Sequence, residues 1–63
     1  MKIEIRVDRC SDKTFRLTHP DGGREFISNP REEKWDRSFS TQALDLYQNV
    51  YGYKRRDIRF YVP

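Results

Sequence analysis

Residues 39–52 read FSTQALDLYQNVYG, and this stretch predicts the one complete helix of the chain. Ser40 suits the N-cap position, because its side-chain oxygen can accept a hydrogen bond from a free N–H of the first turn. Phe39, just before it, is placed to pack on Leu44 as a hydrophobic staple. Gly52 stands where a left-handed terminating residue is favoured. The apolar residues of the segment share one helix face, which is formed by Ala43, Leu44, Tyr47, Val50 and Tyr51.

The segments before this helix predict strands that give its apolar face a surface to cover. Residues 2–9 alternate charged and apolar side chains, and residues 14–18 do the same after a short polar connection over residues 10–13. A connection this short predicts an antiparallel hairpin, since a parallel crossover needs about a dozen residues or more. The side chains that face inward are Ile3, Ile5, Val7, Phe15 and Leu17.

Two further strands are expected, one on each side of the helix. The turn-forming sequence HPDGG at residues 19–23 ends the second strand. Residues 24–28 predict a short third strand with either Phe26 or Ile27 turned inward, because two adjacent apolar residues do not set its phase. Residues 57–62 restore the alternation before Pro63. Their inward residues are Ile58, Phe60 and Val62, and their outward residues are Asp57, Arg59 and Tyr61.

Residues 29–37 have the composition of a helix start. Asn29 is a capping residue, Pro30 suits the first helical position, and acidic residues follow where the helix dipole favours them. Trp35 is the only apolar anchor in this segment. The segment therefore predicts one or two turns of helix, or a folded loop.

These elements predict a small α+β domain with ββ(β)αβ order. Its sheet, antiparallel or mixed, has three to four strands, with the amphipathic helix packed on one face. A right-handed crossover through the helix lets the last strand run parallel to the first, which places residues 2–9 in the sheet interior. Residues 1–5 (MKIEI) and 13–17 (KTFRL) resemble, in residue class, the first hairpin of ubiquitin-like β-grasp domains. The resemblance implies a β-grasp-like plan and no particular function.

Length and composition bound the class of protein. The 63 residues predict one domain, 1–63, whose small core must be compact and aromatic; the chain has four Phe, four Tyr and one Trp. The single cysteine, Cys10, cannot form an internal disulfide, which favours a reducing cytoplasm. No apolar run is long enough to cross a bilayer, and the start Met1-Lys2-Ile3 predicts neither a signal peptide nor an anchor, so no membrane partner is expected.

The net charge of +3 is concentrated near one end of the chain. Basic and acidic residues balance within residues 1–53. The surplus comes from four basic residues beyond that range against Asp57, namely Lys54, Arg55, Arg56 and Arg59. A general polyanion binder needs a broader excess, because its affinity depends on how many phosphates it neutralises.

The outward side of the predicted sheet is the first candidate binding surface. Three strands contribute side chains to it: Arg6, Arg16, Arg59 and Tyr61. Arg and Tyr dominate binding hot spots because they combine large contact area with directed hydrogen bonds. The alternative is cross-strand charge pairing with Glu4, Asp8 and Asp57, worth about 0.2–1 kcal/mol per pair.

Other candidates lie outside the sheet. Lys54, Arg55 and Arg56 follow the helix C-terminus, where the dipole favours cations; they also suit docking to phosphate or to an acidic protein patch. Trp35 is either a lid on the edge of the core or an exposed anchor for a partner. Tyr53 follows the helix and is free to contact a partner.

Catalytic chemistry is not expected. His19 lies in turn-forming sequence, and Cys10 has no identifiable histidine partner. The pair Gly22 and Gly23 lacks the lysine and the following helix of a phosphate loop. The sequence therefore predicts no enzyme, no metal site and no cofactor.

The composition favours a small non-enzymatic protein-binding module, an inhibitor or adaptor that covers a partner surface. In size and plan it is similar to small phage-encoded host-takeover proteins, anti-CRISPR proteins among them. We expect a cytoplasmic monomer or weak homodimer with a protein or nucleoprotein partner. The alternative is direct nucleic-acid binding through the sheet face and residues 54–59, as in the three-stranded sheets of some integrase and plant transcription-factor domains. Against it, the outward phase lacks the paired aromatics that single-strand readers use.

Overall fold

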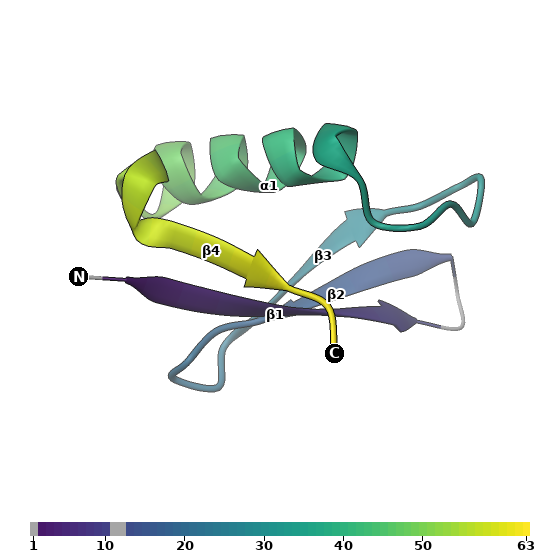
Figure 1. Ribbon diagram of the computed structural model, residues 1–63, viewed down its shortest axis with the longest axis horizontal. Coiled ribbons are helices and arrows are strands. Elements are labelled where there is room, and N and C mark those ends of the chain that lie inside the picture. Colours follow the sequence, from purple (N-terminus) through teal and green to yellow (C-terminus); the bar gives the residue numbers. More distant parts are fainter. Residues whose placement is uncertain (1, 11–12) are drawn as a thin grey trace.

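A computed structural model describes residues 2–10 and 13–63, and it has the predicted α+β architecture (Figure 1). Met1 lies outside the described residues, as do Ser11 and Asp12 of the predicted polar connection. The elements in chain order are β1 (Ile3–Cys10), β2 (Thr14–Thr18), β3 (Arg24–Ser28), α1 (Arg37–Val50), the 3₁₀ turn η1 (Arg55–Asp57) and β4 (Ile58–Tyr61).

The four strands form one mixed sheet in the order β3-β2-β1-β4. β1 pairs antiparallel with β2 and parallel with β4, while β2 pairs antiparallel with β3. The predicted position of the first strand in the sheet interior is therefore confirmed. The helix α1 lies across one face of the sheet and leaves the opposite face uncovered (Figure 1).

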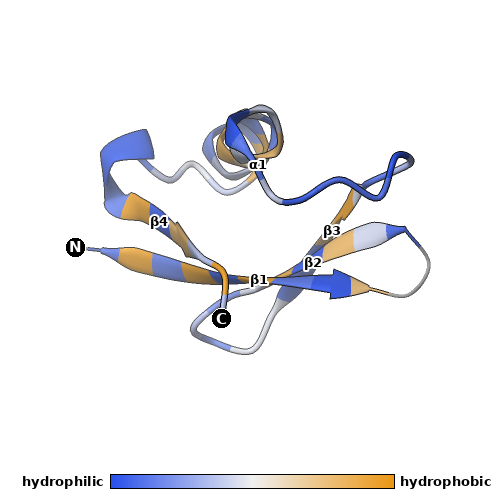
Figure 2. Ribbon diagram, turned by 45° about the vertical axis from the view of Figure 1, so that its right-hand side comes forward, coloured by the Kyte–Doolittle hydropathy of each residue, from blue (hydrophilic) through white to orange (hydrophobic). Residues whose placement is uncertain are grey.

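The core lies between α1 and the covered face of the sheet. Figure 2 shows hydrophobic and hydrophilic residues alternating along β1, so that one face of this strand is apolar. Rings pack edge to face within the core: the centroids of Phe15 and Phe39 are 4.8 Å apart. Its buried residues are Ile5, Val7, Phe15, Leu17, Ile27, Phe39, Ala43 and Tyr47. Five partly buried residues complete it at the margins: Ile3, Trp35, Tyr53, Ile58 and Phe60.

The third strand takes the phase that buries Ile27. Its partner across the β2–β3 pairing is the buried Phe15, so Ile27 joins the core while Phe26 is 58% exposed on the other side. Val62 lies on the predicted side of the sheet, where it borders a cavity together with the core residues Val7 and Phe15, but it is not buried. Val62 follows the end of β4 and is 61% exposed, because the sheet pairing stops at Tyr61.

The helix begins earlier than predicted, and its N-cap is Asp36, not Ser40. The Asp36 carboxylate accepts a hydrogen bond from the backbone N–H of Phe39 at 3.1 Å, and its carbonyl accepts one from Ser40 N–H at 3.0 Å. Phe39 is thus a buried helical residue and not a residue of a staple before the helix. This start aligns Phe39, Ala43 and Tyr47 at fourth-residue spacing on the sheet, whereas Val50 is 69% exposed.

Gly52 terminates the helix α1, as predicted. Gly52 has a φ of +73°, a backbone conformation that costs a residue with a Cβ atom about 1–2 kcal/mol. The N–H groups of Tyr51 and Tyr53 both donate to the Tyr47 carbonyl, at 3.2 and 3.1 Å. These hydrogen bonds close the helix and turn the chain toward β4.

Residues 29–36 form the folded loop, the second of the two predicted alternatives. The side chain of Asn29 is fully buried and bonds both the N–H and the carbonyl of Glu33, each at 3.0 Å. Glu32 has a φ of +55°, which is incompatible with a continuing right-handed helix. The guanidinium of Arg9 donates to the carbonyls of Glu32 and Glu33 and thereby holds the loop over the end of β1.

Candidate interaction surface

The uncovered side of the sheet, called here the open face, is built from alternate residues of all four strands. It consists of Glu4, Arg6, Asp8, Cys10, Thr14, Arg16, Thr18, Arg24, Phe26, Ser28, Arg59 and Tyr61. The pairing aligns Arg16 with Asp8 on one side and with Phe26 on the other, and it aligns Arg6 with Tyr61. The structure therefore brings together the four sheet residues proposed from the sequence.

Asp8 organises two of the arginines on the open face. Its carboxylate lies 3.1 Å from Arg6 Nε and 3.6 Å from Arg16 Nη2, and its side chain is 19% exposed. Cross-strand pairing was the alternative interpretation of these arginines, and it occurs between Asp8 and Arg16, whereas Arg6 and Asp8 lie two residues apart on β1. Such pairs contribute about 0.2–1 kcal/mol each, so they orient the guanidinium groups more than they stabilise the fold.

Part of the hydrogen-bonding capacity of the open-face arginines is unused. Arg16 Nε is buried and has no hydrogen-bond partner among the described residues. Arg59 lies opposite Glu4 in the sheet register but forms no ion pair within residues 2–10 and 13–63. The open face therefore carries four arginines against two acids, and the exposed guanidinium of Arg59 is available to an incoming ligand.

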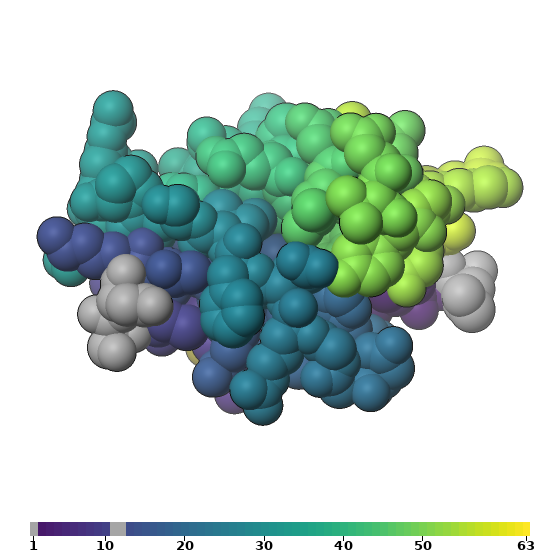
Figure 3. Space-filling model, turned by 180° about the vertical axis from the view of Figure 1, so that it is seen from behind, coloured from purple at the N-terminus to yellow at the C-terminus, as the bar shows by residue number. Residues whose placement is uncertain are grey.

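Two exposed aromatic side chains lie on the open face. Phe26 and Tyr61 are 58% and 43% exposed, and they stand on the two edge strands, β3 and β4. Figure 3 shows the β3 segment at the surface below α1 when the molecule is seen from behind. Sequence reasoning did not select Phe26, since only the alignment of Ile27 with Phe15 decides which neighbour faces the core.

The basic segment after the helix is separate from the open face. Lys54 and η1 lie between the end of α1 and the start of β4 (Figure 1). Arg55 Nη1 lies 3.5 Å from the carboxylate of Asp45 on the exposed side of α1. Arg56 is exposed and has no ion-pair partner in the described part of the chain. The predicted basic residues thus divide between two surfaces.

Trp35 and Tyr53 pack against the core. The Trp35 ring meets Phe15 edge to face with centroids 5.2 Å apart, and it lies 5.4 Å from Phe60. This position is that of the lid considered from the sequence. Tyr53 stacks on the fully buried Tyr47 at 6.1 Å. Both side chains remain partly exposed, so each presents only an edge to a partner.

A polar cluster under the helix C-terminus was not anticipated. His19 occupies the predicted turn, but its ring is buried and Nε2 lies 2.7 Å from the Tyr47 hydroxyl. Tyr51 donates a hydrogen bond to the Glu25 carboxylate. This bond raises the pKa of Tyr51 to about 12, and burial raises the pKa of Tyr47. The cluster joins α1 to β3 and to the turn at residues 19–23.

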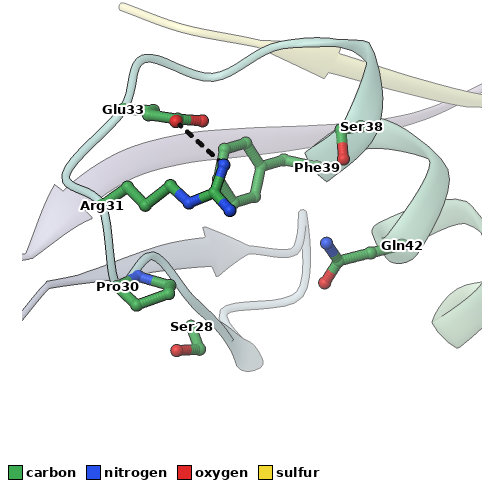
Figure 4. A pocket seen from close by; sticks show the side chains of 7 residues that line it. All are labelled: Ser28, Pro30, Arg31, Glu33, Ser38, Phe39 and Gln42. Carbon is green, nitrogen blue, oxygen red and sulfur yellow. Dashed lines mark ion pairs between the residues drawn. The ribbon is translucent and has the colours of Figure 1, made fainter.

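A cavity lies where the end of β3, the loop and the start of α1 meet. It has a volume of about 440 Å³ and is lined by Ser28, Pro30, Arg31, Glu33, Ser38, Phe39 and Gln42. In Figure 4 the Arg31 side chain pairs with Glu33, at an Nη1 to Oε1 distance of 3.8 Å. Because its one cation is paired, this cavity has no evident charge preference.

No protein-family model, curated protein or solved structure matches the chain. Within residues 2–10 and 13–63, no three His, Cys, Asp or Glu side chains group in a way that could hold a metal ion. None of the described helices has the length and apolar character needed to span a membrane. The fold and the surface define the class of protein: a small α+β domain with one uncovered sheet face.

Proposed function

We propose that the protein is a small non-enzymatic protein-binding module, an inhibitor or adaptor that covers a partner surface with its open face. One observation carries the proposal: Phe26 is 58% exposed and is aligned with Arg16 on the uncovered side of the sheet. An exposed aromatic ring beside a guanidinium group combines apolar contact with directed hydrogen bonding, as binding hot spots do.

The charge of the open face indicates the kind of partner surface. Four arginines and two acids favour an acidic patch that also offers an apolar recess for Phe26. Asp8 holds Arg6 and Arg16 before binding, which lowers the side-chain entropy that binding has to overcome. Electrostatic matching of this type accelerates association and discriminates between partners.

The size of the open face indicates where further contacts lie. With strands about 4.8 Å apart and about 3.3 Å per residue, the face covers on the order of 300 Å². A standard protein interface buries about 800 Å² on each partner. The contact therefore extends onto a sheet edge, and the unpaired side of β3 beside Phe26 is available to a strand of the partner.

Affinity capture from host lysate, with and without nuclease, tests this proposal. Phe26→Thr removes the exposed ring while keeping a residue that favours strands, and Val50→Thr removes an apolar side chain of similar exposure from α1. We expect nuclease-resistant capture of a protein that Phe26→Thr weakens at least about tenfold and Val50→Thr leaves unchanged. Equal capture by both variants would contradict the role of the open face.

Direct nucleic-acid binding is the second candidate, because both exposed aromatic rings of the open face lie among its arginines. Three strand spacings, about 14 Å, separate the strands that carry Phe26 and Tyr61, which is too far for stacking on adjacent bases. Titration with short duplex or single-stranded DNA at ~0.15 M salt is expected to show no binding tighter than roughly micromolar. Tight, saturable binding would reverse the order of the two candidates.

A further inference from the structure

A second cavity, on the helix side of the sheet, is unrelated to the open face. It has a volume of about 380 Å³ and lies between the loop at residues 29–36, the end of β1 and the residue that follows β4. Its described lining consists of Val7, Arg9, Phe15, Lys34, Trp35 and Val62. A volume of this size falls at the lower end of the range for small-molecule sites, about 300–1,000 Å³.

The lining divides into apolar walls and a basic rim. Val7 and Phe15 are core residues, 1% and 3% exposed, so they form the floor of the cavity and present little surface to a ligand. Trp35 and the exposed Val62 complete the apolar walls. The charged residues of the described lining are both cations, Arg9 and Lys34, and no acid is among them. The cavity therefore combines a hydrophobic interior with positive charge.

The two cations are held differently. The Arg9 guanidinium donates to the carbonyls of Glu32 and Glu33, which fixes it at the edge of the cavity. Lys34 is exposed and has no ion-pair partner among the described residues. Its ammonium is thus available to a ligand, because no ion pair with a carboxylate of the described residues has to break first. Strongly hydrated cations on flexible stems commonly bind ligand anions in this way.

We propose that this cavity binds a small apolar carboxylate, in which an aryl or branched alkyl group enters between Trp35 and Val62. The carboxylate then lies at the rim, where Lys34 forms the principal ion pair and Arg9 adds positive potential. The apolar group of the ligand needs no hydrogen-bond partner, which suits the accessible apolar surface of Trp35 and Val62. This site lies on the covered side of the sheet, so its occupancy is independent of the open face.

The single tryptophan makes the site directly observable, because Trp35 forms one of its walls. Titration with 4-phenylbutyrate is expected to change Trp35 fluorescence and to shift its indole N–H resonance, with a dissociation constant of about 1 mM, as ligands of this size allow. The matched neutral probe, 4-phenylbutanol, should bind at least about fivefold more weakly, since it lacks the charge that Lys34 recognises. Equal affinities for the acid and the alcohol would overturn the proposal.

Two lysine variants test the rim. Lys34→Gln is expected to weaken 4-phenylbutyrate binding about fivefold without changing the affinity for the alcohol. Lys54→Gln removes an exposed lysine beyond the other end of α1 and should leave both affinities unchanged. If the two variants weaken the acid equally, the effect is one of net charge and the proposed site is wrong. Val62→Glu, which places an acid at the cavity, should abolish binding of the acid.

The same chemistry occurs at the C-terminus of a peptide that ends in an apolar residue. A second arm therefore compares the peptide Ala-Ala-Phe as the free acid and as the amide, read at the Trp35 resonance. Binding of the peptide acid tighter than that of 4-phenylbutyrate assigns the site to chain termini, and weaker binding assigns it to free small acids. Binding of the amide as tightly as the acid would contradict recognition of a carboxylate.

Discussion

The Tyr47 hydroxyl lies 2.7 Å from Nε2 of His19, and both side chains are buried, at 0% and 7% exposure. The two residues are 28 positions apart in the sequence. Their hydrogen bond ties the last turns of α1 to the turn that follows β2. It also satisfies two polar groups that would otherwise be buried without partners, which is the condition for keeping them in so small a core.

Tyr47→Phe should therefore destabilise the protein by about 1–3 kcal/mol, because the ring is kept but the His19 nitrogen loses its partner. Urea denaturation measured by circular dichroism gives the free energy of unfolding. Tyr61→Phe removes a hydroxyl from the 43% exposed open-face tyrosine and should change stability by less than about 0.5 kcal/mol. Equal losses in the two variants would show that the buried hydrogen bond does not stabilise the protein more than an exposed hydroxyl does.

The tyrosine cluster predicts a loss of stability at high pH. The hydrogen bond to Glu25 raises the pKa of Tyr51 from 10.0 to about 12, so the folded state holds this proton more tightly than the unfolded chain. Its contribution is complete below pH 10 and is lost as the pH rises toward 12. Urea midpoints between about pH 9 and pH 12 should fall more for the wild type than for Tyr51→Phe. Parallel curves would contradict the shift.

The N-cap correction gives a matched pair of variants. Asp36→Ala should cost about 0.5–2 kcal/mol, because the N–H of Phe39 loses the carboxylate that caps it at 3.1 Å. Ser40→Ala changes the residue that the sequence suggested as the cap, and it should be nearly neutral, since Ser40 lies inside the helix. Thermal unfolding of the two variants decides between the two positions. A larger loss for Ser40→Ala would favour the cap predicted from the sequence.

Core and surface apolar residues should respond very differently to truncation. Leu17→Ala empties a fully buried position and should cost about 2–5 kcal/mol, a large part of the roughly 3–9 kcal/mol expected for a domain of this length. Val50→Ala should stay within about 0.5 kcal/mol, because Val50 is 69% exposed although it belongs to the predicted apolar helix face. Denaturant midpoints measure both. A substantial loss for Val50→Ala would place it in the core.

The basic segment after α1 can be tested by charge reversal. The double change Arg55→Glu and Arg56→Glu should leave the fold intact, because the ion pair with Asp45 is exposed and worth about 0–1 kcal/mol. We expect it to weaken capture of the partner. The double change Arg31→Glu and Arg37→Glu, outside this segment, alters the net charge by the same amount and serves as the control. Unchanged capture by the double variant would remove this segment from the binding surface.

Local pattern was sufficient for most of the fold. Alternation placed three of the four strands, the turn at residues 19–23 indicated the start of the third, and the short connection after β1 required an antiparallel hairpin. A helix before the last strand implied the parallel pairing that is observed between Ile3 and Ile58. The helix start was misplaced because Ser40 and Asp36 are both good caps, and only burial of Phe39 against Phe15 favours the earlier one.

The sequence predicted only part of the candidate site. Strand phase alone located Arg6, Arg16, Arg59 and Tyr61 on one side of the sheet. The pattern of β3 does not decide which of the adjacent residues Phe26 and Ile27 faces outward. The sequence therefore did not predict that Phe26 is the most exposed ring of the open face. The cavity beside Trp35 escaped notice as well, since its walls come from four segments distant in the sequence.

The sequence by itself determined the strands, the single helix, its glycine end and the existence of an arginine-bearing face, because these depend on periodicity and on the backbone preferences of individual residues. Only the tertiary structure decided that Phe26 faces outward, that His19 is buried against Tyr47 and that Arg9 and Lys34 border one cavity. Those relationships depend on which distant segments share a register or a packing contact, and the energy that selects them arises only when the chain closes on itself.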